Sequence, residues 1–409
     1  PLRYRATPAR ARAVAARIEA QIDAPARPAS LVVRDGRVVA RPARAGRGVD
    51  TARLTALIGR LPAQAAVPVT VVDPGVSDAQ AETARLQAER IAATPAVVRG
   101  AGRRAVVRRP ELLEALRFDQ TPDGIDVSLA PGVVADAVRP SFEGILRPAE
   151  SAGFAVEGTR VSVTPSSPGR GLDEPELAKR IVRRTGSAPV RVPIVPLTPA
   201  RTTAQAKALG IEERVSTFTT PYACCQPRVT NIRLAARVLD RTLIPAGGTF
   251  SLNDVLGERT RARGFVPAPQ INAGELEDAV GGGVSQMATT TFNAAFFAGF
   301  EIISHTPHEF WITRYPPGRE ATVSWGGPEM IVRNDWPAAA LMTVSTTDTS
   351  LTVSLYSSKL GRRVETTSSG DAVEGTAFTE TVTRKVWRGS TLRRDETYRW
   401  TYKEPPADE

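Results

Sequence analysis

Apolar and polar positions along the chain follow two kinds of period, which together predict a mixed α+β protein. Helix-like spacing of apolar residues occurs at about 9–22 and 133–146, and alternating runs follow around Asp35-Gly36 and Gly158-Thr159. Alternation with a period of two on either side of turn residues is typical of a β-hairpin. We therefore expect a helix and then a two-stranded hairpin in each of these two segments.

The two segments are copies of one another. The sequence around residues 35–54 returns around residues 158–177. Three matched pairs keep one offset of 123 residues: Pro25 with Pro148, Pro42 with Pro165, and Leu54 with Leu177. An offset held constant over such a span indicates an internal duplication.

Each copy continues with a Gly-Arg-Gly segment, at 46–48 and 169–171, and an aspartate, Asp50 or Asp173, that suits the N-cap of a helix. The segment either grips a carboxylate or phosphate or forms the turn that starts the helix. A β-rich run and another helix follow, the runs being Val67–Val72 and Val190–Val195.

Composition changes mark further boundaries. The first copy carries an insert at 95–130, for which we expect strands at Ala96–Arg99 and Ala105–Arg108 and a helix at Pro110–Leu116. A linker is expected around Gly210–Thr220. The chain after residue 341 alternates apolar and polar residues and predicts a terminal hairpin around Arg388–Ser390, then a loose tail, Glu404–Glu409. Four parts are predicted: 1–130 with its insert, 131–214, 215–345, and the β-rich extension 346–409.

Charge and size limit the classes of function. The net charge of +10 comes mostly from arginine and fits either an anionic partner or simply a solvated arginine-rich surface. The basic residues are scattered and lack interleaved aromatic residues, which argues against nucleic acid as the partner. No stretch approaches the roughly 18 apolar residues that span a bilayer. Because the sequence begins at Pro1, we expect that a signal peptide or anchor has been removed.

The cysteines, Cys224 and Cys225, are adjacent. One peptide bond brings their Cα atoms closer than ordinary disulfide geometry prefers, so reduced, buried side chains are the simpler expectation and a strained ring disulfide the alternative. Two cysteines do not make a disulfide framework.

The two histidines of the chain lie close together in sequence, just after a run of glycines. A glycine run, Gly281–Gly283, leads into an apolar helical segment, and the two histidines of the chain, His305 and His308, follow within twenty-five residues. Glycines allow positive φ and close approach to a ligand, and the amides of a helix N-terminus favour an anion or a developing oxyanion. The region therefore predicts a site without yet naming a reaction.

From Arg228 to about Tyr356 the chain resembles the VanW family. The resemblance rests on ordered motifs, namely Arg228–Ile232, Pro245–Asn253, Gly257–Thr260, Gly264-Phe265, Gly281–Thr291, His308 and Tyr315–Val323. The duplicated units resemble, more loosely, the peptidoglycan-binding domains that often precede VanW domains. The resemblance implies a bacterial cell-envelope protein, exported and tethered by an N-terminal signal anchor that this chain does not contain.

The resemblance also implies roles around the glycine turn. Many VanW domains carry cysteine where this chain has Ser285, and those domains are linked to L,D-transpeptidase chemistry with histidine as the base. Serine is far less acidic than cysteine and needs a close base and an oxyanion hole. Ser285 is accordingly a candidate nucleophile, with a helix N-cap or substrate contact as the alternative.

Other positions have both a functional and a structural interpretation. His308, just before a predicted strand at Phe310–Tyr315, is a candidate base or ligand contact. Alternatively its hydrogen bonds serve only the fold. His305 is expected to be structural. Arg319 could capture a stem-peptide carboxylate or pair with Glu320. The remaining candidate substrate-binding residues are Gly281, Gly282, Gly283, Gln286, Thr289, Arg228 and Asn231. The last two lie on a helix to Val238 and either line the same cleft or only anchor that helix.

We expect two repeated wall-binding units and a β-rich VanW domain that bind peptidoglycan or another anionic wall polymer, with the cleft around Ser285 and His308 recognising a stem peptide. The competing hypothesis is a serine-variant acyltransferase acting on peptidoglycan cross-links, and a third is a non-catalytic spacer. A further hypothesis gives Cys224 or Cys225 the thiol that position 285 lacks. No ligand spacing suggests a metal site or another cofactor.

Overall fold

The computed structural model describes residues 6–60, 64–272 and 275–405 and confirms the mixed α+β class. The chain forms two compact units. Unit 1 comprises Pro1–Glu150 with Pro168–Thr198, and unit 2 comprises Ser151–Ser167 with Pro199–Glu409. This division runs through the second repeat, and the four predicted parts remain a prediction.

The duplication is visible in the strands. Hairpin β1 (Ser30–Arg34) with β2 (Arg37–Arg41) returns as β9 (Gly153–Glu157) with β10 (Arg160–Thr164). The register is also the same, since Leu31 lies opposite Ala40 in the first hairpin and Phe154 lies opposite Val163 in the second. The predicted hairpins are therefore confirmed in both copies.

The Gly-Arg-Gly segments are strands, β3 (Gly46–Val49) and β11 (Gly169–Leu172), so the interpretation as a helix-starting turn is wrong. The chain just before each hairpin explains the first glycine of each segment. A Cβ atom on Gly46 would lie 2.5 Å from the Ala26 nitrogen, and one on Gly169 would lie 2.4 Å from the Ala149 nitrogen. Backbone approaches so closely that any side chain is excluded.

The predicted helix caps are confirmed. Asp50 accepts a hydrogen bond from the Arg53 amide at 2.9 Å and starts α2 (Thr51–Gly59). Asp173 accepts from the Glu176 amide at 3.0 Å and starts α6 (Glu174–Arg183). An aspartate at this position satisfies an amide that the helix cannot satisfy itself.

The rest of unit 1 agrees broadly with the prediction, including the insert. Its other elements are α1 (Pro8–Ile22), β4 (Val69–Val72), α3 (Asp78–Ala92), β5 (Ala96–Gly100), β6 (Arg103–Val107), α4 (Arg109–Ala115), β7 (Leu116–Thr121), β8 (Gly124–Leu129), α5 (Pro131–Val138), β12 (Val190–Arg191) and β13 (Ile194–Leu197). The helix predicted to reach residue 146 stops early and gives way to a 3-10 turn, Arg139–Phe142, because Pro140 lacks the amide that the helix needs. Phe142, Leu177 and Ile181 lie in the core of this unit.

Unit 2 is built on a six-stranded sheet in the order β15-β21-β22-β14-β10-β9. The strands not yet described are β14 (Glu213–Pro221), β15 (Leu243–Ile244), β21 (Ala340–Thr346) and β22 (Ser350–Ser357). The linker predicted at Gly210–Thr220 is wrong, because β14 pairs with β22 along almost its whole length. Its buried positions are the polar residues Ser216 and Thr220, which hide the apolar alternation of a strand.

Smaller elements complete unit 2. They are α7 (Thr203–Ala208), α8 (Pro227–Leu239), β16 (Thr249–Ser251), α9 (Leu252–Leu256), a 3-10 turn at Arg261–Arg263, β17 (Pro267–Asn272), β18 (Glu275–Val280), α10 (Ser285–Phe297), β19 (Glu301–Ser304) and β20 (Ile331–Arg333). Helix α8 confirms the helix predicted to reach Val238. The strand predicted at Phe310–Tyr315 is wrong, since these residues form bends and turns.

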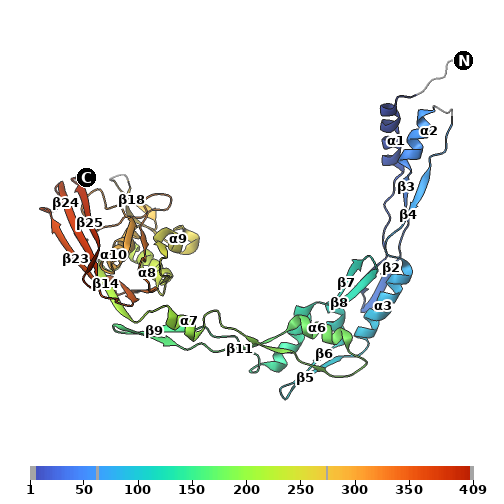
Figure 1. Cartoon of the computed structure of the whole chain (residues 1–409), viewed down its shortest axis with the longest axis horizontal. Coiled ribbons are helices and arrows are strands. Elements are labelled where there is room, and N and C mark those ends of the chain that lie inside the picture. The colour runs from blue at the N-terminus through green and yellow to red at the C-terminus, as the bar shows by residue number, and fades with distance from the viewer. Residues whose placement is uncertain (1–5, 61–63, 273–274, 406–409) are drawn as a thin grey trace. The chain divides into compact units, whose positions relative to one another are not determined.

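Within the predicted extension, β22 belongs to the six-stranded sheet. The chain after it folds as a three-stranded sheet of β23 (Arg362–Ser369), β24 (Phe378–Arg388) and β25 (Thr391–Tyr402), which lie side by side in Figure 1. The predicted terminal hairpin is thus confirmed and gains a third strand. The last part of the predicted tail, 406–409, lies outside the described residues. Among the helices of the described ranges, none combines the length and the apolar character that a membrane span requires.

Candidate functional site

A cavity of about 390 Å³ opens in unit 2 beside the glycine turn. Its wall comes from the start of α8, from β17, from the turn and first residues of α10, and from the chain between His308 and Val323. The lining residues are Gln226, Pro227, Arg228, Pro269, Gln270, Gly281, Gly283, Val284, Ser285, Gln286, His308, Ile312, Arg314, Tyr315, Thr322 and Val323. The described lining contains two arginines and no carboxylate.

The glycine turn has its shape because side chains would not fit there. A Cβ on Gly282 would lie 2.0 Å from the carbonyl oxygen of Ala268. Gly283 has a φ of +91°, and a Cβ on it would lie 2.8 Å from the Cβ of Arg228. The glycines therefore let the turn pass between β17 and α8 and bring Arg228 to the wall of the cavity.

Arg228 is 8% exposed and is held by a neutral side chain. Its Nη2 donates to Oε1 of Gln286 at 2.9 Å, and Gln286 in turn donates to Thr220 Oγ1 and to the Pro221 carbonyl, both at 2.9 Å. Burial lowers the pKa of Arg228, but a guanidinium keeps its charge in proteins. Across the described residues, no carboxylate pairs with this charge.

His308 is joined to a buried carboxylate. Its Nδ1 lies 2.6 Å from Oε2 of Glu320, and the two residues are 6% and 0% exposed. Because Nδ1 is engaged, Nε2 is the ring nitrogen left for a ligand in the cavity that His308 lines. Oε1 of Glu320 accepts a hydrogen bond from the Tyr402 hydroxyl at 2.9 Å. An imidazole oriented by a carboxylate has the arrangement of a general base and its orienting group.

Ser285 lies on the same cavity but does not cap the helix, so that interpretation is wrong: it is the first residue of α10 and Val284 is the N-cap. Its Oγ accepts from the Val323 amide at 3.3 Å and lies 3.3 Å from Thr322 Oγ1. Within the described chain its hydroxyl makes no hydrogen bond to His308, and its own amide has no acceptor. The site brings Ser285 and His308 to one cavity without joining them.

Four predicted site residues lie outside the cavity wall: Gly282, Asn231, Thr289 and Arg319. Asn231 donates to the carbonyls of Gly282 and Val266 and so fastens the glycine turn. Thr289 bonds to the backbone of Ala321. The Arg319 guanidinium lies over the rings of Phe296 and Phe297. These residues contact the framework of the site, whereas Gly281, Gly283, Gln286 and Arg228 line it.

His305 packs away from the cavity. Its ring stacks on Phe292 with centroids 4.4 Å apart and meets Tyr398 edge-on. Burial lowers its pKa to about 4, so this imidazole is neutral at physiological pH. The structural role expected for His305 fits these contacts.

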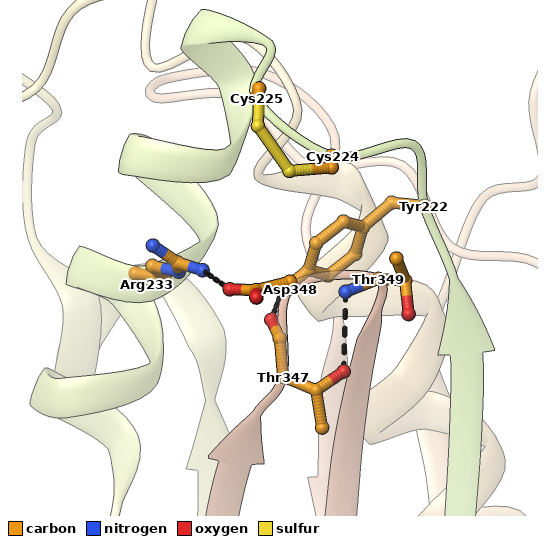
Figure 2. Close-up of a disulfide and its surroundings, with 7 residues drawn as sticks. All are labelled: Tyr222, Cys224, Cys225, Arg233, Thr347, Asp348 and Thr349. Atoms are coloured by element: carbon orange, nitrogen blue, oxygen red, sulfur yellow. Dashed lines mark hydrogen bonds and ion pairs between the residues drawn. A yellow bond between two sulfur atoms is a disulfide. The ribbon is translucent and has the colours of Figure 1, made fainter.

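Cys224 and Cys225 form a disulfide and are both exposed, so the expectation of reduced, buried cysteines is wrong. Figure 2 shows the disulfide in the segment that leads into α8, near Tyr222. Tyr222 anchors this segment by donating from its hydroxyl to the Thr347 carbonyl at 2.6 Å. Neither cysteine lines the cavity, although Gln226 and Pro227 directly after them do.

Sequence reasoning missed several parts of the site. Arg314 and Tyr315 line the cavity with a cation–π contact of 5.3 Å between them, and Thr322 and Val323 face Ser285. The available signal was the Tyr315–Val323 motif, which contains three of these residues and directly follows Arg314. Tyr402 gave no signal, because it lies 82 residues after Glu320 and meets it only through the fold.

Comparison with known proteins finds similarity in one part of the chain. Residues 227–356 match the family model described as VanW like protein. A relative from Bacillus subtilis (strain 168), the uncharacterized protein YoaR, is 41% identical over 131 residues, which is 32% of this chain and 43% of that protein. The chain thus spans less than half the length of the curated relative that it matches. No solved structure matches.

Proposed function

We propose that the protein, whose residues 227–356 match the VanW-like family model, is a cell-wall protein that binds peptidoglycan and that its cavity receives the carboxylate of a stem peptide. Peptidoglycan or another anionic wall polymer is the proposed partner, at the extracytoplasmic face of the envelope. The two upstream repeat units are proposed to contribute further wall contacts, for which the net charge of +10 is favourable.

The buried charge of Arg228 is the observation that carries this proposal. A cation removed from water is unfavourable until an anion compensates it, and the described cavity wall offers none. A carboxylate suits a guanidinium because two parallel hydrogen bonds can form. The free amide of Ser285, at the start of α10, provides a further donor to an anion.

Calorimetric titration with a soluble muropeptide bearing a tetrapeptide stem tests the proposal. We expect Arg228→Gln to weaken binding about ten- to hundredfold, as for loss of a hydrogen bond to a charged group worth about 1.5–3 kcal/mol. Arg237→Gln is the matched control, because Arg237 is an exposed arginine on the same helix. Equal binding by both variants, or by a stem whose terminal carboxyl is amidated, would exclude this role for the cavity.

The His308–Glu320 pair favours a second candidate, acyl transfer on peptidoglycan cross-links. Here Ser285 Oγ would attack a stem-peptide carbonyl while its proton passes to Nε2 of His308. The C–N bond of the peptide would break and the leaving amine would take that proton. The resulting ester would react with an amine of a second stem or with water. The present hydrogen bonds of Ser285 require its side chain to turn toward His308 first.

Intact-protein mass after incubation with the same muropeptides tests the second candidate. An added acyl mass that is absent from Ser285→Ala identifies an acyltransferase and its nucleophile. Ser285→Cys is a useful companion, because a thiolate forms more readily beside histidine and at a helix start. If neither the natural chain nor Ser285→Cys acquires mass while both bind the muropeptide, the protein is a binding module.

A further inference from the structure

We propose that the end of strand β25, through Trp400 and Tyr402, positions the His308–Glu320 pair. The C-terminal sheet would then help to set the geometry of the site. This inference rests on the proposed function of the cavity. Trp400 and Tyr402 lie outside the segment 227–356 that matches the family model.

The chain that carries His308 and Glu320 has no regular structure of its own. Residues 305–320 form neither helix nor strand. A loop of this length needs contacts from elsewhere to hold two side chains in one geometry, because its backbone has no ladder of hydrogen bonds. Helix α10 supplies some of these contacts, and β25 with its neighbour β24 supplies those nearest to His308 and Glu320.

Two residues, Trp400 near the C-terminal end of β25 and Lys403 just after that strand, hold the loop backbone at His308 and Glu309. The indole Nε1 of Trp400 donates to the His308 carbonyl at 3.0 Å. The amide of Lys403 donates to the Glu309 carbonyl at 2.7 Å. Two successive carbonyls of the loop are thus bonded to Trp400 and to Lys403, which directly follows β25. These bonds fix the backbone position from which the imidazole ring extends.

Tyr402 holds the carboxylate side of the pair. Its hydroxyl donates to Oε1 of Glu320 at 2.9 Å and accepts from the Gly318 amide at 2.7 Å. Glu320 therefore uses one oxygen for His308 and the other for Tyr402. Burial raises the pKa of the Tyr402 phenol, which keeps its proton available as a donor. A carboxylate bonded at both oxygens cannot rotate freely, and neither can the imidazole bonded to it.

The sheet is a rigid support for these contacts. Strand β25 pairs with β24 from Thr391 to Tyr402, where Tyr402 lies opposite Phe378. The rings of Phe378 and Tyr402 pack with centroids 4.8 Å apart, and Trp311 of the loop meets Phe378 edge-on. Gly318, with a φ of +67°, turns so close to β24 that a Cβ would lie 2.7 Å from Val382 Cγ2.

Histidine NMR tests the positioning directly, since the chain has only two histidines. In protein labelled with ¹⁵N-histidine, His305→Gln assigns the signals, and the ring nitrogens of His308 report which one carries the hydrogen-bonded proton. We expect Tyr402→Phe, which removes one hydroxyl, to shift and broaden the His308 Nδ1–H signal and to weaken muropeptide binding at least threefold. Tyr398→Phe is the matched control, because Tyr398 lies on the same strand and contacts His305 instead.

Trp400→Phe provides a second test if Tyr402→Phe does not fold. It removes the donor to the His308 carbonyl and is expected to shift the same signal. An unchanged His308 signal in a folded Tyr402→Phe protein, judged by an unaltered melting temperature, overturns the proposal. The NMR readout needs no ligand, so its failure is distinct from a failure of the proposed function, which the Arg228→Gln titration detects.

Discussion

Thr289 is bonded to both backbone groups of Ala321: its hydroxyl donates to the Ala321 carbonyl and accepts from the Ala321 amide, each at 3.1 Å. The pair joins helix α10, which starts at Ser285, to the segment that carries Glu320 and Thr322. One side chain thereby sets the spacing between two walls of the cavity. Both partners are fully buried, so no water replaces these bonds.

We expect Thr289→Val to lower the free energy of unfolding by about 2–6 kcal/mol, because two buried backbone groups lose their partner at roughly 1–3 kcal/mol each. Denaturant unfolding measures this. Thr291→Val is the control, since Thr291 lies buried on the same helix with a hydroxyl that has no partner among the described residues. It should be neutral or stabilising, and equal effects of both substitutions would contradict the argument.

A second prediction concerns Gly282 in the glycine turn. Gly282→Ala places a methyl group 2.0 Å from the Ala268 carbonyl oxygen, a backbone atom that cannot move aside alone. We expect a loss of about 3 kcal/mol or more in stability, together with loss of muropeptide binding, because β17 must shift away from the cavity.

Gly132→Ala is the control for this substitution, since a Cβ there meets nothing within 4 Å and the residue lies in helix α5. Alanine is favoured over glycine in a helix, so the melting temperature should stay or rise. A Gly282→Ala protein with normal stability would mean that the turn has another shape in solution.

The parts of this fold that sequence could predict are those with local causes. Turn residues between alternating runs indicate hairpins, and Asp50 and Asp173 indicate helix starts. Strand β14 escaped prediction because its buried face is polar: Ser216 donates to the Ala294 carbonyl, and Thr220 bonds to Thr290 of α10. Hydrophobic periodicity cannot reveal a strand that is buried through hydroxyl groups.

The same distinction applies to the site. The glycine run, Arg228 and His308 could be selected because residue type and neighbouring sequence indicated chemistry. The partners that give them a role, Glu320 for His308 and Gln286 for Arg228, depend on contacts across the fold. For Arg319 the sequence suggested capture of a stem-peptide carboxylate or an ion pair, whereas the structure places its guanidinium over the ring of Phe297.

His305 predicts a pH dependence of stability. Its pKa is about 4 in the folded chain and ordinarily about 6.5, so both states are neutral well above pH 6.5 and stability is then complete. Below pH 6.5 the unfolded chain binds the proton first, and stability falls until the pH reaches about 4. We expect a loss of about 2 kcal/mol between pH 7 and pH 5 from this residue.

Unfolding of the natural chain and of His305→Gln at both pH values isolates this effect from other titrating groups. The natural chain should lose about 2 kcal/mol more than the variant between pH 7 and pH 5. Equal losses would show that His305 accepts a proton in the folded state as readily as in water.

The disulfide gives the last prediction. It closes a loop between adjacent residues, Cys224 and Cys225, and therefore restricts the unfolded chain very little. Replacing both with serine should lower the free energy of unfolding by only about 1 kcal/mol. Muropeptide binding should stay within about threefold, because Tyr222 and the start of α8 still hold Arg228 in place. Conversely, a double-serine variant that folds but loses binding or acyl transfer would make the sulfur atoms participants in the chemistry of the cavity, and Ser285 would then no longer be the nucleophile to test first.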